Sequence, residues 1–145
     1  MSPRDAEPIE LEPAFQMRVD FERRAVTRTP RGGRLFAPVA GGSVWGPRLT
    51  AEVVPQTGAD YGLNRHDDVE DIHSCFMLRA ADGVDIFIRQ FGYRRAADGY
   101  IRVTPFFDAP RESAHAWLNN TILLGLGQED PGPAASVLFT YHRVL

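Results

Sequence analysis

The sequence contains no lysine, a single cysteine and no long apolar run, and each of these absences excludes a class of protein. All 16 of its Lys and Arg residues are arginine, which rules out a lysine Schiff base, lysine-linked pyridoxal phosphate and a Walker A phosphate loop. Within one chain, Cys75 alone forms neither a disulfide nor a zinc or iron–sulfur site built from several thiolates. The apolar stretches are too short to cross a bilayer as a helix, so we expect no membrane segment.

Charge and the N-terminal segment limit the partners and the location. The formal net charge is -3 and no block of like charges stands out, so we expect no nucleic-acid partner. Residues 1–8 lack the basic cluster and the apolar run of a secretory signal, which favours a cytoplasmic protein. With 43% hydrophobic and 24% charged residues, the 145-residue chain has the composition of one ordinary folded domain.

Alternation of apolar and polar residues predicts an antiparallel β protein. Strands are expected over residues 14–21, 70–81, 84–96, 100–107, 121–126 and 136–144. Asp82-Gly83 and Asp98-Gly99 are hairpin signals, because both residue types tolerate positive φ. Residues 56–68 are predicted to be a long polar loop, and residues 110–120 one short helix.

The chain ends inside a strand-like segment, which favours a barrel over an open sheet. A last strand that pairs with the first removes the exposed edges. We therefore expect an all-β fold, a closed antiparallel up-and-down-like barrel of about 8 strands with one short helix, lipocalin-like in general architecture. Residues 1–12 are predicted to be a flexible leader and residues 13–145 a single barrel domain.

The length of the two Asp-Gly turns decides which side chains of the central strands face inward. If both turns have two residues, one face carries His73, Cys75, Met77, Val84, Ile86, Ile88, Gln90, Ile101, Val103 and Phe107. This face is largely aliphatic, with His73 and Gln90 together at the end remote from the first turn, as in small-molecule pockets. We interpret it as the lumen.

The opposite face mixes aromatic residues with arginines, as suits a surface covered by the helix or by a second subunit in a homodimer. A one-residue slip exchanges the two faces. In that case Arg89, Tyr93 and Arg102 become the pocket residues, and the ligand would be anionic.

Several fragments, in this order, resemble the bacterial and fungal proteins grouped as domain of unknown function 3237, also called UPF 0311. They are Gly41-Gly42, Gly46-Pro47-Arg48-Leu49, Gly58-Ala59-Asp60-Tyr61, Asp82-Gly83, Gly92-Tyr93-Arg94, Tyr100-Ile101-Arg102, Pro105-Phe106-Phe107 and Trp117-Leu118-Asn119. The resemblance covers nearly the whole chain beyond residue 14. It implies a small β-barrel, with Asp60 and Trp117-Leu118-Asn119 as pocket or scaffold positions. The chain departs from the family pattern at His73 and Cys75, where the resemblance implies an acidic residue and an arginine.

His73 and Asp60 are the candidate catalytic residues. His73 is the histidine placed in the lumen, and its ordinary pKa lies near neutrality, although a structural role is the alternative. Asp60 is expected at the barrel mouth, where it orients or deprotonates a substrate or only binds its own turn.

The candidate ligand-binding residues are Tyr61, Gln90, Arg102, Phe107 and Trp117. Gln90 and Tyr61 would hydrogen-bond a substrate oxygen. Phe107 and Trp117 would shape the cavity. Arg102 belongs to the alternative in which the two faces are exchanged.

The four histidines, His66, His73, His115 and His142, show no metal-binding spacing, so we expect no metal and no cofactor. A metal site, if there were one, would combine His66 or His73 with Asp60, Asp67 or Asp68.

The sequence favours a cofactor-independent acid–base enzyme of the isomerase, cyclase or lyase type. It would act on a largely apolar small organic molecule that is aromatic or carries a carbonyl group. The alternative is a non-catalytic carrier or sensor of the same kind of molecule. A third hypothesis is an interaction module that dimerises through its arginine-rich and aromatic face.

Overall fold

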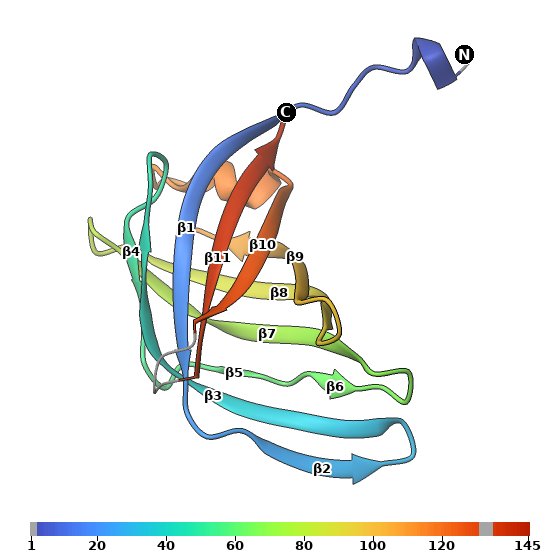
Figure 1. The fold of residues 1–145 in the computed structure, drawn as a ribbon. Coiled ribbons are helices and arrows are strands. Elements are labelled where there is room, and N and C mark those ends of the chain that lie inside the picture. Colours follow the sequence, from blue (N-terminus) through green and yellow to red (C-terminus); the bar gives the residue numbers. More distant parts are fainter. Residues whose placement is uncertain (1–2, 131–134) are drawn as a thin grey trace.

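Strands in eight positions close into an antiparallel barrel in the computed structural model, which describes residues 3–130 and 135–145 (Figure 1). The strands are β1 (Leu11–Phe21), β2 (Ala25–Thr29), β3 (Gly32–Trp45), β4 (Ala51–Val53), β5 (Ala59–Asp60), β6 (Leu63–Asn64), β7 (Val69–Ala80), β8 (Asp85–Arg95), β9 (Tyr100–Asp108), β10 (Leu123–Asp130) and β11 (Ala135–Val144). Two short 3₁₀ helices accompany them, η1 (Pro3–Asp5) and η2 (Ala116–Asn120).

The barrel closes through β1, which pairs with β11 on one side and with β3 on the other. Met17 of β1 lies opposite Phe139 of β11 and opposite Val44 of β3. From β11 the order continues through β10, β9, β8 and β7, and β4, β5 and β6 together fill the position between β7 and β3. The predicted closed antiparallel barrel, with its first and last strands paired, is confirmed.

The prediction of one long polar loop over residues 56–68 is wrong, because β5 and β6 lie within it. Both are short, and the chain turns sharply beside them: Gln56 and Asp68 adopt positive φ values of 62° and 64°. A Cβ at Gly58 would lie 1.8 Å from the carbonyl oxygen of Cys75, so only glycine permits this close approach. Strands of two residues carry no alternation pattern, which is why the sequence did not predict them.

The predicted helix over residues 110–120 shortens to η2, one turn of 3₁₀ helix. Asn119 fixes it to the end of β9, since its side chain accepts a hydrogen bond from the Ala109 N–H at 2.7 Å and donates one to the Ala109 carbonyl. Neither helix of the described chain is long and apolar enough to cross a membrane.

Aromatic and aliphatic side chains fill the barrel at its centre and next to η2. This helix lies at one end of the barrel (Figure 1). The Phe15 ring lies 6.1 Å from that of Phe107 and 5.0 Å from that of Tyr141. Leu118 of η2 is 2% exposed, and Trp117 packs beside the same core. Burial of each large apolar side chain stabilises the fold by roughly 1.5–3 kcal/mol. The hollow part of the barrel lies at the opposite end.

The turn between β7 and β8 corrects the predicted faces. Arg79 pairs with Asp85, and the Ala80 N–H donates to the Val84 carbonyl, so the turn consists of the three residues 81–83. A three-residue turn shifts β7 by one position relative to a two-residue turn, and a one-residue shift exchanges the faces of a strand. His73, Cys75 and Met77 therefore point outward, and the prediction that they face the lumen is wrong.

The faces predicted for β8 and β9 are confirmed. Their turn has four residues, 96–99, because Arg95 pairs with Tyr100. Lengthening a turn by two residues leaves the faces unchanged. Ile86, Ile88 and Gln90 accordingly point into the barrel and are buried, as do Ile101, Val103 and Phe107 of β9.

Candidate functional site

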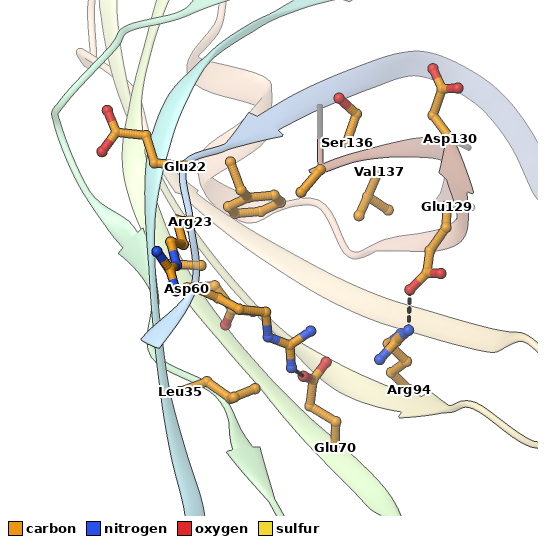
Figure 2. Close-up of a pocket in the computed structure, with 14 residues that line it drawn as sticks. Glu22, Arg23, Leu35, Asp60, Glu70, Arg94, Glu129, Asp130, Ser136 and Val137 are labelled. Atoms are coloured by element: carbon orange, nitrogen blue, oxygen red, sulfur yellow. Dashed lines mark hydrogen bonds and ion pairs between the residues drawn. The ribbon is translucent and has the colours of Figure 1, made fainter. Parts of the chain in front are cut away.

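A cavity of about 620 Å³ opens at the end of the barrel remote from η2 (Figure 2). It lies where β1 and β10 end and where β11 begins, and the link between β1 and β2 borders it. Its lining consists of Phe21, Glu22, Arg23, Arg24, Leu35, Ala37, Asp60, Glu70, Arg94, Glu129, Asp130, Ala135, Ser136 and Val137. The volume falls in the range of small-molecule sites. Eight of the fourteen lining residues are charged, and Phe21, Leu35 and Val137 are the large apolar ones.

Asp60 reaches the cavity from β5, between Ala37 of β3 and Ser74 of β7. Its carboxyl group accepts hydrogen bonds from the backbone N–H groups of His73 and Gly62 and from the Ser74 hydroxyl. All of these donors are uncharged. Burial raises the pKa of Asp60 above its ordinary value, although these hydrogen bonds oppose the shift. The carboxyl group therefore holds a proton to higher pH than an exposed aspartate does.

Glu70 lies on β7, on the same inward face as Ser74, and is 7% exposed. Arg24 reaches it from the link between β1 and β2, with Nη2 of Arg24 3.0 Å from Oε1 of Glu70. Burial and, next, the negative charge of Asp60 raise the pKa of Glu70, while the charges of Arg24 and Arg94 act in the opposite direction. Asp60 and Glu70 thus line the same cavity, and the negative charge of Asp60 acts on Glu70.

Arg94 supplies the second cation of the cavity. It is the cross-strand neighbour of Glu70 on β8, and its guanidinium group forms an ion pair with Glu129 of β10 on the facing wall (Figure 2). The cavity therefore contains two arginine–carboxylate contacts, Arg24 with Glu70 and Arg94 with Glu129. These two arginines offset part of the negative charge of the acidic lining.

A buried polar pair lies deeper in the barrel than the cavity. The Tyr141 hydroxyl donates a hydrogen bond to Oε1 of Gln90, and both side chains are at most 1% exposed. Burial raises the pKa of Tyr141 far above its ordinary value, so the phenol stays protonated. Ser74 lies opposite Gln90 in the β7–β8 ladder, and it connects this pair with Asp60 along the inner wall.

Among the predicted site residues, the structure places Asp60 in the cavity, at the barrel mouth where it was expected. Gln90 faces the lumen as predicted, but it lies below the cavity and is bonded to Tyr141. Phe107 also faces inward and belongs to the filled core. Trp117 packs beside the core with η2, at the end of the barrel away from the cavity (Figure 1).

His73, Tyr61 and Arg102 lie on the outer surface, away from the cavity. The His73 ring stacks on Phe91 with 4.9 Å between centroids, and the Tyr61 ring lies 5.7 Å from that of Phe36. Arg102 lies over the Tyr100 ring at 4.6 Å. The structure therefore brings none of these three side chains into the cavity. The exchanged-face alternative is also wrong, because Arg89 and Tyr93 point outward too.

Glu70, Arg24 and Arg94 are the cavity residues that the sequence reasoning missed. The signal for Glu70 was present in the alternation Glu70–Ile72–Ser74–Phe76, which becomes the inner face once the turn is given three residues. Nothing in the local sequence predicts Arg24, because its role depends on the β1–β2 link crossing the mouth. Across residues 3–130 and 135–145, no group of three or more His, Cys, Asp or Glu side chains is arranged to hold a metal ion.

Comparison with known proteins identifies a family whose sequence pattern extends over the whole barrel. A family model described as a protein of unknown function (DUF3237) matches residues 9–144. No curated protein matches the chain.

Crystal structures of distant relatives share the fold. A β-barrel-like protein from Acinetobacter baumannii is 24% identical, with a TM-score of 0.85 over 97% of this chain and 99% of that chain. A protein of unknown function from Clostridium acetobutylicum is 20% identical, with a TM-score of 0.86 over 97% and 100% of the two chains. A protein described as an enzyme, from Penicillium herquei, is 19% identical, with a TM-score of 0.74 over 97% of each chain.

Proposed function

The chain belongs to the DUF3237 family of proteins of unknown function, and from its cavity we propose that it is a cofactor-independent acid–base enzyme of the isomerase, cyclase or lyase type. The observation that carries the proposal is the presence of Asp60 and Glu70 in one cavity, next to Arg24 and Arg94. Two carboxyl groups whose pKa values are raised by burial are suited to donate and accept protons.

We infer an uncharged substrate that has an apolar part and a carbonyl or hydroxyl group. Phe21, Leu35 and Val137 offer apolar contact surface within the cavity. Arg24 and Arg94 each already contact a carboxylate, so an anionic substrate held by either of them would have to displace an ion pair. A neutral oxygen can instead receive a hydrogen bond from a protonated carboxyl group.

The environments of the two carboxyl groups suggest different roles. Glu70 contacts a guanidinium group, which favours its ionised form, and we assign it the role of base. Asp60 accepts hydrogen bonds from neutral donors only, as far as its described contacts show, and we assign it the role of acid.

In an isomerisation, Glu70 accepts a proton from a C–H bond next to the substrate carbonyl while Asp60 gives its proton to the carbonyl oxygen. The C–H electron pair forms the C=C bond of an enol, and the carbonyl π pair forms the new O–H bond. Where the substrate has a C=C bond between its β and γ carbons, this intermediate is a dienol. Glu70 then returns its proton to the γ carbon, the double bond moves to the α,β position, and the O–H group returns its proton to Asp60 as the carbonyl group re-forms. Both carboxyl groups are restored, and no oxidant or reductant is consumed.

The Penicillium herquei relative supports the enzyme class, because it is described as an enzyme and has the same fold. The second candidate function is a non-catalytic carrier or sensor of the same kind of molecule. Two ion pairs in the cavity, Arg24 with Glu70 and Arg94 with Glu129, favour the carrier. They can hold a bound molecule without taking part in a reaction.

Native mass spectrometry of the purified protein, compared with the denatured protein, tests the cavity. We expect a small organic molecule bound to the native protein and absent from Leu35→Trp, because the larger side chain fills the cavity. Asp60→Asn and Glu70→Gln should keep the bound molecule, because the amides are nearly isosteric, but should lose its conversion when it is incubated with the protein. His73→Ala is the matched control and should retain both. Binding and unchanged conversion in both amide variants would overturn the assigned roles, and binding with no conversion by the native protein would favour the carrier.

A further inference from the structure

The outward side chains of β7, β8, β9 and β10 form an exposed apolar surface, which we call the outer face. It is formed by Phe91, Tyr93, Phe106, Ile122, Leu124 and Leu126, which are 37% to 54% exposed. Phe91 lies between the His73 ring at 4.9 Å and the Phe106 ring at 6.3 Å, so the aromatic side chains form one continuous group. Exposed apolar groups of this size are unusual on a monomer and mark interaction surfaces.

The β8–β9 ladder places the polar side chains of the outer face symmetrically about this group. Along β9 the outward residues are Arg102, Thr104, Phe106 and Asp108, in that order. Arg102 and Asp108 are therefore equally far from the midpoint between Thr104 and Phe106. Phe91 lies beside Thr104, and Arg89 lies beside Phe106.

Arg102 and Asp108 carry opposite charges that the chain does not neutralise by itself. Among the described residues, no ion pair includes either of them. The Arg102 guanidinium lies over the Tyr100 ring and donates to the Ile101 carbonyl. The outer face thus has the Arg102 cation at one side of its aromatic group and the Asp108 anion at the other. Arg89, a second cation without a described ion pair, lies over the Phe106 ring at 5.6 Å.

We propose that the outer face binds a second copy of this chain, with a two-fold axis that runs across the strands between Thr104 and Phe106. Rotation about this axis reverses the strand direction. Arg102 then faces Asp108 of the second copy, and the large Phe106 faces the small Thr104 of that copy. Phe91 faces Arg89 of the second copy, a cation–π contact.

The charges select this arrangement over its alternative. A two-fold axis parallel to β9 would place Arg102 over Arg102 and Asp108 over Asp108, which repel each other. An isologous interface needs a self-complementary surface, and the outer face is self-complementary only about the axis across the strands. Two sheets that pack face to face also leave enough depth for the aromatic side chains to interdigitate.

Sedimentation velocity from about 5 to 200 μM tests the dimer, with Kd as the readout. We expect the native chain to reach twice its mass of 16.2 kDa. Arg102→Asp and Asp108→Arg should each weaken the dimer by at least about tenfold, because each places like charges together. The double variant Arg102→Asp/Asp108→Arg should restore it, because the pair is reversed and not lost. Arg31→Asp, in the turn between β2 and β3, is the control for a change of charge alone.

Three results would overturn the proposal. They are a chain that stays monomeric throughout this range, a dimer that both single variants leave intact, and a double variant as weak as the single ones. All of the altered side chains are exposed, so circular dichroism and thermal unfolding should be unchanged and should exclude misfolding as the cause.

Discussion

The hydroxyl group of Tyr141 donates its hydrogen bond to the side-chain oxygen of Gln90 inside an otherwise apolar barrel. One residue comes from β11 and the other from β8, so the bond crosses the lumen between strands that are not neighbours. Each group satisfies the other in a place that water does not reach, since both residues are at most 1% exposed.

Removing one partner of this hydrogen bond leaves the other as a buried polar group without a partner, which removing both does not. Tyr141→Phe leaves the Gln90 oxygen without its donor, and Gln90→Leu leaves the Tyr141 hydroxyl without its acceptor. Each single variant should lower the free energy of unfolding by about 1–3 kcal/mol, measured by urea denaturation. The double variant should lose less than the sum of the two single variants. Simple additivity would show that the two groups are not coupled.

The pH dependence of stability should report the buried acid. Because burial raises the pKa of Asp60 above its ordinary value of 3.8, the folded chain binds this proton more tightly than the unfolded chain. The contribution of protonated Asp60 to the free energy of unfolding is therefore present at low pH, and it is lost as the pH rises through the pKa of Asp60 in the folded chain. Asp60→Asn removes this loss, so the stability of the variant relative to the native chain should be greater at about pH 7 than at about pH 3.5, which lies below the unfolded pKa.

Glu112→Gln is the control for this measurement, because Glu112 is exposed and lies outside the cavity. Its stability should follow that of the native chain at both pH values. An identical pH profile for Asp60→Asn and the native chain would contradict the raised pKa. Comparing each variant with the native chain cancels the contributions of carboxyl groups that do not interact with the altered residue.

Gly92 should not tolerate a side chain. A Cβ at this position would lie 2.0 Å from the carbonyl oxygen of Arg102, so Gly92→Ala must push β8 and β9 apart. We expect a loss of about 1–3 kcal/mol in the free energy of unfolding. Gly33→Ala is the matched control, since its Cβ would come closest to the flexible end of Val26 at 3.0 Å. Equal losses in the two variants would show that the close approach of β9 is not the cause.

Truncation of side chains on opposite faces of β7 should change the free energy of unfolding by very different amounts. His73 is exposed, so His73→Ala should change the free energy of unfolding by less than about 0.5 kcal/mol. Phe76 is 1% exposed and faces the core, so Phe76→Ala should cost about 3–5 kcal/mol. Thermal or urea unfolding of both variants checks this. A large loss for His73→Ala would contradict the outward assignment of its side chain.

The barrel and most of its strands could be predicted from the sequence, because long strands with one buried face carry a clear alternation of apolar and polar residues. The inner face of β8 and β9 followed from the same pattern. For β7 the pattern alone was insufficient, since Phe76 and Leu78 on one face and Cys75 and Met77 on the other are all apolar. The length of the turn before Val84 then decided the faces, and the pair Asp82-Gly83 fits a turn of two residues or of three.

The candidate site was predictable only in part, for a related reason. Asp60 stood out in its Gly-Ala-Asp-Tyr segment, whereas Glu70 was hidden by the assignment of β7. Arg24 contacts Glu70 across 46 positions of sequence, and a contact of that range depends on how the β1–β2 link crosses the barrel mouth. Local patterns do not encode such contacts.

The packed core fills the barrel between the cavity and η2, so the cavity opens at one end of the barrel. A molecule that reaches Asp60 and Glu70 has to leave by the mouth through which it came, past the link that carries Arg24. Product and incoming substrate therefore compete for the same cavity. For a catalyst of this shape, accumulated product acts as a competitive inhibitor, and the reaction slows as it proceeds unless another protein removes what is made.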